Sequence, residues 1–431
     1  MENVDLIIHN VGQLATCASN GTAKKGAAMQ DVGILENGAA AVKDGVIAAI
    51  GKSDEILRRF EAANLIDAGQ KVVCPAFIEC HTHIVFAGDR INEFELRIKG
   101  ASYLEIMEAG GGIVSTMRQT REASLAELVE QSRRRLDRLL ESGVTTCEVK
   151  TGYGLNTETE LKMLEAIFEL DKLHEINLLP TFLPAHAVPP EFKENSDEYV
   201  DLICKEMLPL VNSKFQTSDF KFQMFADVFC EKNAFDLKQS RKVLETAKSL
   251  GFKLKAHVDE FTNLGGARMA IELGAVSIDH LDAISDEEIK LLANSKTIGV
   301  VTPTVNFNFG SLLFADARKM IDAGCAIALS TDFNPGSAPC PSLPLAMAIA
   351  CRYQKLMPSE VLNAATINAA FAVGSGDTIG SIEVGKRADV LILDATDFRQ
   401  LSYEFGGNSV EKVIKNGKIV TKGANYTAKT E

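Results

Sequence analysis

The sequence predicts an α/β fold, a (β/α)8 TIM barrel with a small β-sandwich domain built from both chain ends. Three observations support this prediction. Eight apolar, β-rich runs alternate with helical patterns through the middle of the chain. Both ends of the chain are β-rich and lack this alternation. Several of the runs end in a polar residue, as expected where the carboxyl ends of barrel strands converge on one mouth.

The N-terminal end is expected to form short strands. Val4 to His9 is the first β-rich run, and residues 39–42 and 46–50 flank Lys43-Asp44-Gly45. Because Asp-Gly between two such runs is a strong hairpin signal, these two runs are predicted to pair as antiparallel strands.

The C-terminal end has the same character. Residues 388–393 and 410–415 are β-rich, and Asn416-Gly417 follows the second run. Two β-rich ends around a different middle suggest one small domain assembled from both termini. We therefore expect residues 1–70 and 372–431 to form a discontinuous β-domain, and residues 71–371 to form the barrel.

The middle of the chain carries the barrel pattern. Helical patterns lie between the runs, for example at Ser124 to Leu140 and Thr157 to Leu173, and Ser124 with Glu127 has the form of a capping box. An open doubly wound sheet is the alternative, but no Gly-x-Gly-x-x-Gly turn follows a strand. The expected strands centre on residues 72–83, 144–150, 178–186, 226–230, 254–257, 276–280, 298–302 and 326–332.

The net charge and the cysteine usage indicate which binding partners and which cellular compartment to expect. The 431 residues carry a formal net charge of -13, which disfavours nucleic acid and anionic membranes by repulsion. The nine cysteines are scattered, without a Cys-x-x-Cys pair, as is typical of a reduced cytoplasmic protein. The start of the chain is acidic and does not resemble a signal peptide, and no apolar stretch is long enough for a membrane span. An anionic substrate would need a specific local cation.

Two histidines follow the first barrel run. His81 and His83 are two residues apart, so on a strand both side chains point to the same face and can take one metal ion. Two surface histidines near a turn are the alternative. His257 and Asp332, at two other strand ends, complete a set that suits zinc or iron. We prefer one metal over two, because residues 225–231 lack a lysine that could bridge a second ion.

Proton transfer is assigned to neighbouring groups. Glu260 lies three residues after His257 and could take a proton from the attacking water and pass it to a leaving nitrogen. A solvated loop glutamate is the alternative. His280 could stabilise a developing oxyanion or share proton transfer, unless it is a core histidine. Asp332 could hold the water proton besides binding metal.

Together these residues resemble the metal-dependent amidohydrolase superfamily, with His-x-His, His-x-x-Glu, Asp-His and Asp at successive strand ends. The resemblance covers essentially the whole chain. Within the superfamily, the sequence most resembles the imidazolonepropionases of histidine degradation. The segments that carry it are residues 75–83, 87–90, 110–113, 150–155, 183–186 and 330–336.

The resemblance implies one divalent or trivalent metal ion, zinc or iron, held by His81, His83, His257 and Asp332. It implies that a metal-activated water opens the cyclic amide of 4-imidazolone-5-propanoate to N-formimidoyl-L-glutamate. Family members are commonly homodimers, so a homodimer is expected here.

The resemblance also implies a set of substrate-binding residues. Positions that match Arg90, Tyr153, His186 and Glu260 hold the imidazolone in the family, and those that match Tyr153, Asn334 and Gly336 hold the opened product. Ser337 stands where the family often has threonine, and Tyr103 is a further candidate for the same pocket.

Arg90 has a chemical reason for its role. It is the one arginine just past the first barrel run, and a guanidinium can grip the substrate propanoate with two hydrogen bonds. A solvated loop arginine is the alternative. Gly110 to Gly112 is not a phosphate loop, since no Lys-Ser/Thr follows, and either a flap over the mouth or a plain linker fits it.

Two other functions compete with this prediction. Another amidohydrolase, such as a cyclic amidine deaminase or an N-acyl amino acid hydrolase, would share the metal site without needing Arg90 and Tyr153. A non-catalytic barrel would be expected to lose metal ligands, and here the whole set is present.

Overall fold

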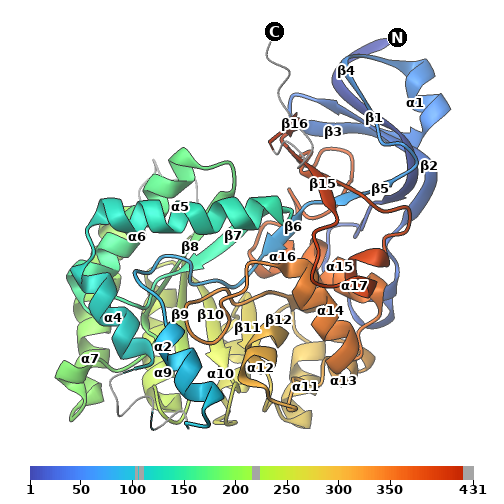
Figure 1. Ribbon diagram of the computed structural model, residues 1–431. Coiled ribbons are helices and arrows are strands. Elements are labelled where there is room, and N and C mark those ends of the chain that lie inside the picture. The colour runs from blue at the N-terminus through green and yellow to red at the C-terminus, as the bar shows by residue number, and fades with distance from the viewer. Residues whose placement is uncertain (102–104, 106–110, 216–223, 421–431) are drawn as a thin grey trace.

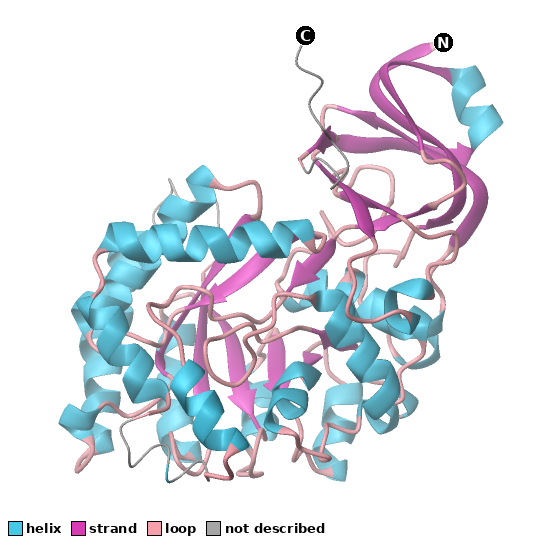
Figure 2. Cartoon of the chain, viewed as in Figure 1, coloured by secondary structure: helices cyan, strands magenta, loops and turns pink. Residues whose placement is uncertain are grey.

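The computed structural model describes residues 1–101, 105, 111–215 and 224–420 and contains two sheets of eight strands each (Figure 1). One sheet carries both chain ends. The other is a parallel barrel, and helices surround it while the first sheet has few helices against it (Figure 2). The expected barrel with a small β-sandwich domain from both ends is therefore confirmed. The domain boundaries at residues 70/71 and 371/372 stay a prediction.

The small domain joins the two ends of the chain through its central strands. The strand order is β16-β15-β14-β5-β1-β2-β3, with β4 also paired to β1, so the C-terminal β14 lies beside the N-terminal β5. Side chains on both faces are buried, because Leu6 and Ile8 join one apolar cluster and Ile7 another. The elements are β1 (Glu2–Ala15), β2 (Ile34–Lys43), β3 (Val46–Lys52), α1 (Ser53–Arg59), β4 (Phe60–Asp67), β5 (Val72–Pro75), β14 (Val390–Leu393), β15 (Val410–Lys415) and β16 (Lys418–Ile419).

The predicted hairpin is present between β2 and β3. Asp44 and Gly45 have φ angles of 52° and 77°, and two consecutive positive φ angles are typical of the tight turn that suits antiparallel strands. Asn416 and Gly417 have φ angles of 48° and 74° and turn β15 into β16 in the same way.

The barrel strands follow one another in chain order, all parallel. An isolated parallel bridge between Thr82 and Phe333 joins the first strand end to the segment after the last strand. The strands are β6 (Phe77–Glu79), β7 (Val144–Lys150), β8 (Asn177–Ala185), β9 (Phe225–Cys230), β10 (Lys253–Val258), β11 (Ser277–His280), β12 (Ile298–Val301) and β13 (Ile327–Leu329).

The first predicted strand, residues 72–83, is divided. β5 belongs to the small sheet and β6 to the barrel, because the backbone N–H of Ala76 still donates to Asp389 whereas that of Phe77 donates to Gly143. His81 and His83 therefore follow a strand instead of lying on one. The bridge at Thr82 keeps this segment paired beside residue 333.

The helices cover the outside of the barrel. Ser124 caps α5 in a capping box, with the Ser124 side chain accepting from the backbone N–H of Glu127 and the Glu127 carboxylate accepting from that of Ser124. The helices of this region are α2 (Ile91–Ile98), α4 (Ile113–Glu122), α5 (Leu125–Glu141), α6 (Thr157–Leu173), α7 (Ser196–Leu202), α8 (Leu208–Phe215), α9 (Leu237–Ser249), α10 (Gly266–Leu273), α11 (Asp286–Ala293), α12 (Pro303–Phe309), α13 (Ala317–Asp322), α14 (Leu343–Tyr353), α15 (Pro358–Ala365), α16 (Ile367–Ala372) and α17 (Gln400–Tyr403).

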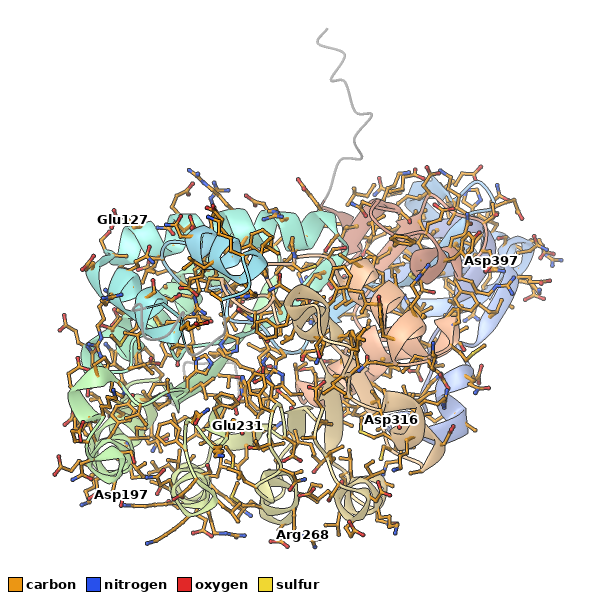
Figure 3. All side chains as sticks on the ribbon, turned by 60° about the horizontal axis from the view of Figure 1, so that its bottom comes forward. Glu127, Asp197, Glu231, Arg268, Asp316 and Asp397 are labelled. Atoms are coloured by element: carbon orange, nitrogen blue, oxygen red, sulfur yellow. The ribbon has the colours of Figure 1, made fainter. Side chains whose placement is uncertain are left out.

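Charged side chains are distributed over the outer surface. Glu127, Asp197 and Asp316 are exposed on different parts of the helical layer, whereas Glu231 lies closer to the barrel axis (Figure 3). Among the described residues, no helix has both the length and the apolar character that a membrane crossing requires.

A buried lysine links the small domain to the barrel. Lys415, on β15, donates hydrogen bonds to the carbonyl of Thr145 (2.8 Å) and to Oδ1 of Asn177 (2.6 Å). Burial lowers the pKa of Lys415 from 10.5 to about 8, although the Asp389 carboxylate opposes the shift.

We expect Lys415 to make the free energy of unfolding rise with pH. Between about pH 8 and 10.5 the unfolded chain keeps the Lys415 proton that the folded chain has lost, so folding becomes more favourable as the pH rises through this window. Denaturant unfolding of the wild type and of Lys415→Met across this range should give curves that diverge, with the wild type gaining more. Parallel curves would contradict the assignment.

Candidate active site and metal centre

A cavity opens at the carboxyl ends of the barrel strands. Its empty volume is about 700 Å³ with the open mouth included, a size that suits a small ligand. His81 is fully buried and is not among the lining residues. The other described residues predicted for the site line the cavity: His83, Arg90, Tyr153, His186, His257, Glu260, His280, Asp332, Asn334, Gly336 and Ser337.

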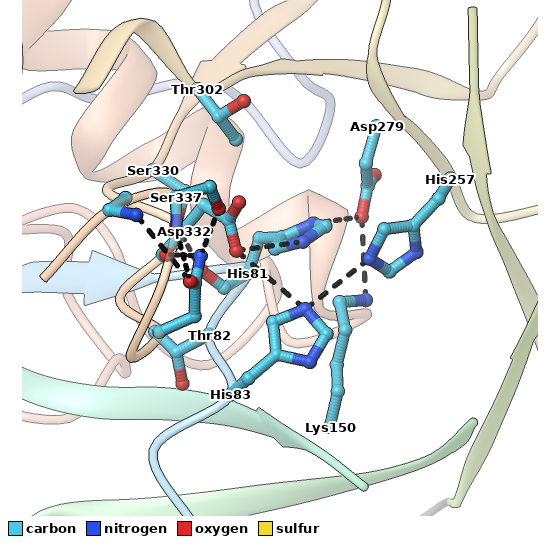
Figure 4. Close-up of polar contacts among 12 residues, drawn as sticks. His81, Thr82, His83, Lys150, His257, Asp279, Thr302, Ser330, Asp332 and Ser337 are labelled. Atoms are coloured by element: carbon cyan, nitrogen blue, oxygen red, sulfur yellow. Dashed lines mark hydrogen bonds and ion pairs between the residues drawn. The ribbon is translucent and has the colours of Figure 1, made fainter. Parts of the chain in front are cut away.

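Four of these side chains converge as the predicted metal ligands would. Nε2 of His81 and Nε2 of His83 lie 3.4 and 3.6 Å from Oδ1 of Asp332 (Figure 4). Nε2 of His83 lies 3.3 Å from Nε2 of His257. The cluster can also include His280, whose nitrogen lies within 4.8 Å of ligand atoms of His81 and Asp332.

The cluster fits a metal ion chemically. Nε2 of His81 and Oδ1 of Asp332 are buried and have no hydrogen-bond partner within the described part of the chain. Burial, together with nearby positive groups, holds the pKa of His81 and His83 well below the usual range, so both imidazoles are neutral and have a lone pair to donate. Three nitrogens and one carboxylate oxygen suit zinc or iron.

Two buried carboxylates stand behind the histidines. Nδ1 of His81 lies 2.7 Å from Oδ2 of Asp279, and Nδ1 of His257 lies 3.0 Å from Oδ2 of Asp227. Such contacts select the tautomer that leaves the other ring nitrogen free for a metal. Sequence reasoning gave Asp227 no role, although an aspartate in the otherwise apolar strand β9 was a usable signal.

The proton-transfer candidates lie beside the cluster. Oε2 of Glu260 is 3.9 Å from Nε2 of His280, and Nδ1 of His280 is 3.0 Å from Oγ1 of Thr302. Burial first, and then the negative charge of Asp332, raise the pKa of Glu260 well above its usual range. A carboxyl with this tendency to hold a proton can act as an acid as well as a base.

Arg90 lies at the start of α2 and lines the same cavity. Its Nε donates to Oγ1 of Thr116 at 2.8 Å, while its buried Nη2 has no partner among the residues that the structure describes. A Cβ atom on Gly336 would lie only 2.1 Å from Nη1 of Arg90. The bare backbone at Gly336 therefore leaves room for the guanidinium.

Two rings extend the wall of the cavity. His186 stacks on His83 with ring centroids 4.8 Å apart, and its Nδ1 lies 3.0 Å from the carbonyl of Gly152. Tyr153 lies 5.4 Å from the His186 ring. The loop that carries Tyr153 is held by the buried carboxylate of Glu160, which accepts from the backbone N–H groups of residues 152, 154 and 155.

Asn334 organises the loop after the last barrel strand. Its amide donates to the carbonyl of Asp332 and to Oγ of Ser337, and its Oδ1 accepts from the backbone N–H groups of Gly336 and Ser337. A direct contact of Asn334, Gly336 or Ser337 with a ligand stays a prediction. Tyr103 and Gly110 lie outside the described residues.

Several lining residues were not found from the sequence. They come from α2, α4 and α12, from strand β9 and from the loop after β10, and nothing in their spacing marks them as functional. They are Glu93, Arg97, Ile113, Phe229, Phe261 and Phe309.

Comparison with known proteins places these features in context. A sequence model of the amidohydrolase family matches residues 72–420. The imidazolonepropionase of Chloroflexus aggregans is 52% identical over 97% of this chain and 99% of its own length. That of Herpetosiphon aurantiacus is 49% identical over 98% of each chain.

Solved structures show the same fold at low sequence identity. An adenosine deaminase from Xanthomonas campestris with bound zinc has a TM-score of 0.73 and 21% identity, covering 98% of this chain and 94% of that protein. The guanine deaminase of E. coli has a TM-score of 0.71 and 15% identity, covering 96% and 98%.

Proposed function

The chain belongs to the amidohydrolase family, and from this membership we propose that it hydrolyses 4-imidazolone-5-propanoate to N-formimidoyl-L-glutamate, a step of histidine degradation. Relatives named imidazolonepropionase share about half of their residues with it over nearly the whole length. One observation favours this substrate above others: Arg90 has an unpaired buried guanidinium nitrogen and lines the same cavity as the histidine–aspartate cluster.

We propose that the protein holds one zinc or iron ion per chain through His81, His83, His257 and Asp332. The free Nε2 of His81 and Oδ1 of Asp332 support this set. When bound, such an ion supplies Lewis-acid activation of a water molecule at neutral pH.

Residues beside the cluster can transfer the proton that ring opening requires, from the attacking water to the ring nitrogen. Water adds to the ring amide carbon, and Glu260 accepts a proton from that water. Glu260 then donates the proton to the ring nitrogen as the carbon–nitrogen bond breaks. His280, 3.9 Å from Glu260, is placed to stabilise the charge that develops on the amide oxygen.

Arg90→Met should weaken the use of imidazolone propanoate without changing metal content. A charge-assisted bidentate pair is worth about 1.5–3 kcal/mol, so kcat/KM should fall roughly tenfold to somewhat over a hundredfold. Arg90→Lys should recover only part, because an ammonium lacks the planar fork. Steady-state kinetics with metal analysis checks this, and an intact kcat/KM in Arg90→Met would exclude Arg90 as the carboxylate clamp.

Gly336→Ala offers a matched test of the same clamp. The added methyl group would meet the Arg90 guanidinium, so this variant should resemble Arg90→Met while it keeps the arginine. Both variants should bind the metal as the wild type does.

The assignment itself is tested by a turnover assay on a panel of substrates. Imidazolone propanoate should be hydrolysed in preference to cytosine, a dihydropyrimidine and an N-acyl amino acid. A preference for a neutral ring such as cytosine would refute the proposed function.

We propose that the protein works in the cytoplasm as a homodimer. All nine cysteines are unpaired, as is usual in a reducing compartment, and the net charge of -13 disfavours nucleic acid and anionic membrane surfaces. Sedimentation of the purified protein tests the dimer.

A further inference from the structure

The barrel interior below the metal cluster contains a group of buried charges. Lys150 and Glu148 lie on β7, Asp227 on β9, Lys255 on β10 and Asp279 on β11, and all five are fully buried. Charges are rarely buried without partners, because the cost of removing them from water must be offset by ion pairs and hydrogen bonds. The partners of each charge therefore indicate its role.

Lys150 is shared by the two carboxylates that stand behind the metal ligands. Its Nζ lies 2.8 Å from Oδ2 of Asp227. The same Nζ lies 3.4 Å from Oδ2 of Asp279 (Figure 4). These same oxygens contact Nδ1 of His257 (3.0 Å) and Nδ1 of His81 (2.7 Å). One ammonium group thus connects both histidine–aspartate pairs.

We propose that Lys150 is a positioning residue of the metal centre, which orients His81 and His257 through Asp279 and Asp227. Lys150 holds each carboxylate beside Nδ1 of one imidazole, so that the opposite ring nitrogens, Nε2 of His81 and Nε2 of His257, point toward Asp332 and His83. Without the ammonium group, the two buried carboxylates would lose the ion pair that they share and would no longer be held beside the imidazoles. This inference rests on the metal site proposed above.

Lys255 provides a matched control in the same interior. Its Nζ lies 2.6 Å from Oε2 of Glu148 and 2.9 Å from the carbonyl of Cys80, and within the described residues it forms no ion pair with Asp227 or Asp279. Lys150→Met and Lys255→Met each remove one buried ammonium group from the same network. Only the first change removes the direct ion pairs with Asp227 and Asp279.

The test measures metal binding, not only catalysis. Stripped wild type, Lys150→Met, Asp279→Asn and Lys255→Met are titrated with zinc and with cobalt(II) against a competing chelator, and circular dichroism verifies the fold. Loss of an outer-shell partner typically weakens metal affinity roughly 10- to 100-fold. We expect that loss in Lys150→Met and Asp279→Asn, with a changed cobalt(II) absorption spectrum, and a wild-type affinity and spectrum in Lys255→Met.

Failure of the positioning role of Lys150 and failure of the proposed metal site would give different results. A wild type that binds neither metal would refute the metal site itself. A wild type that binds metal, with an unchanged affinity and spectrum in folded Lys150→Met, would overturn the positioning role alone. If Lys150→Met does not fold, Lys150→Gln replaces it, and failure of both to fold beside a folded Lys255→Met would assign Lys150 a structural role and also overturn the proposal.

Discussion

Glu260→Gln is expected to retain metal and substrate binding and to lose roughly 10²- to 10⁴-fold in turnover. Glutamine keeps the size of the side chain and can still donate and accept hydrogen bonds, but it cannot take a proton from water and return it to a leaving nitrogen. The position of Glu260 motivates the role, since its side chain lines the cavity beside His280 and is only 12% exposed.

The comparison of kcat with KM makes this test specific. A pure proton-transfer role lowers kcat and leaves KM and metal content near the wild-type values. Near-normal turnover in Glu260→Gln would move the role to His280 or Asp332. Glu160→Gln is not a suitable control, because that carboxylate holds the loop of Tyr153. An exposed position such as Glu127 serves better.

The barrel and the site cluster were predictable from local patterns. Parallel strands of a barrel end at one mouth, so polar residues at the ends of apolar runs must meet there whatever the loops do. The sequence alone therefore predicted that His186, His257 and His280 lie near Asp332. The hairpin at Asp44 was predictable too, because its turn chemistry is local.

The supporting contacts were not predictable in the same way. Asp227 and His257 lie on neighbouring strands, and their pairing depends on the register of β9 against β10, which no local pattern specifies. The change of sheet at Ala76 depends on backbone partners more than 65 residues away in the chain, at Gly143 and Asp389. The contribution of α2 and α12 to the cavity lining was not predictable either, because it depends on where these helices pack relative to the mouth of the barrel.

A single metal ion is expected because the described part of the barrel offers no free lysine that could bridge a second ion. A second ion would need a bridging ligand, and β9 has Asp227 but no lysine. The nearby Lys150 forms ion pairs with Glu148, Asp227 and Asp279, all within 3.4 Å. These carboxylates raise the pKa of Lys150 although burial opposes the shift. The side chain is therefore an ammonium group and not the neutral amine that could be modified to bridge two metal ions.

His257→Ala should therefore abolish both metal retention and turnover while the barrel still folds. Nε2 of His257 lies 3.3 Å from Nε2 of His83, so its loss removes one of the four proposed metal donors. The flanking Ala256 and Val258 stay buried in β10, and Asp227 keeps its ion pair with Lys150.

Elemental analysis after dialysis measures this prediction directly. The wild type should contain close to one ion per chain and His257→Ala almost none, with similar circular dichroism. His9→Ala, in β1 of the small domain and far from the cluster in sequence, should match the wild type in both metal content and turnover. Two tightly held ions in active wild-type protein would refute the single-metal site, and an active His257→Ala that keeps its ion would remove His257 from the ligand set.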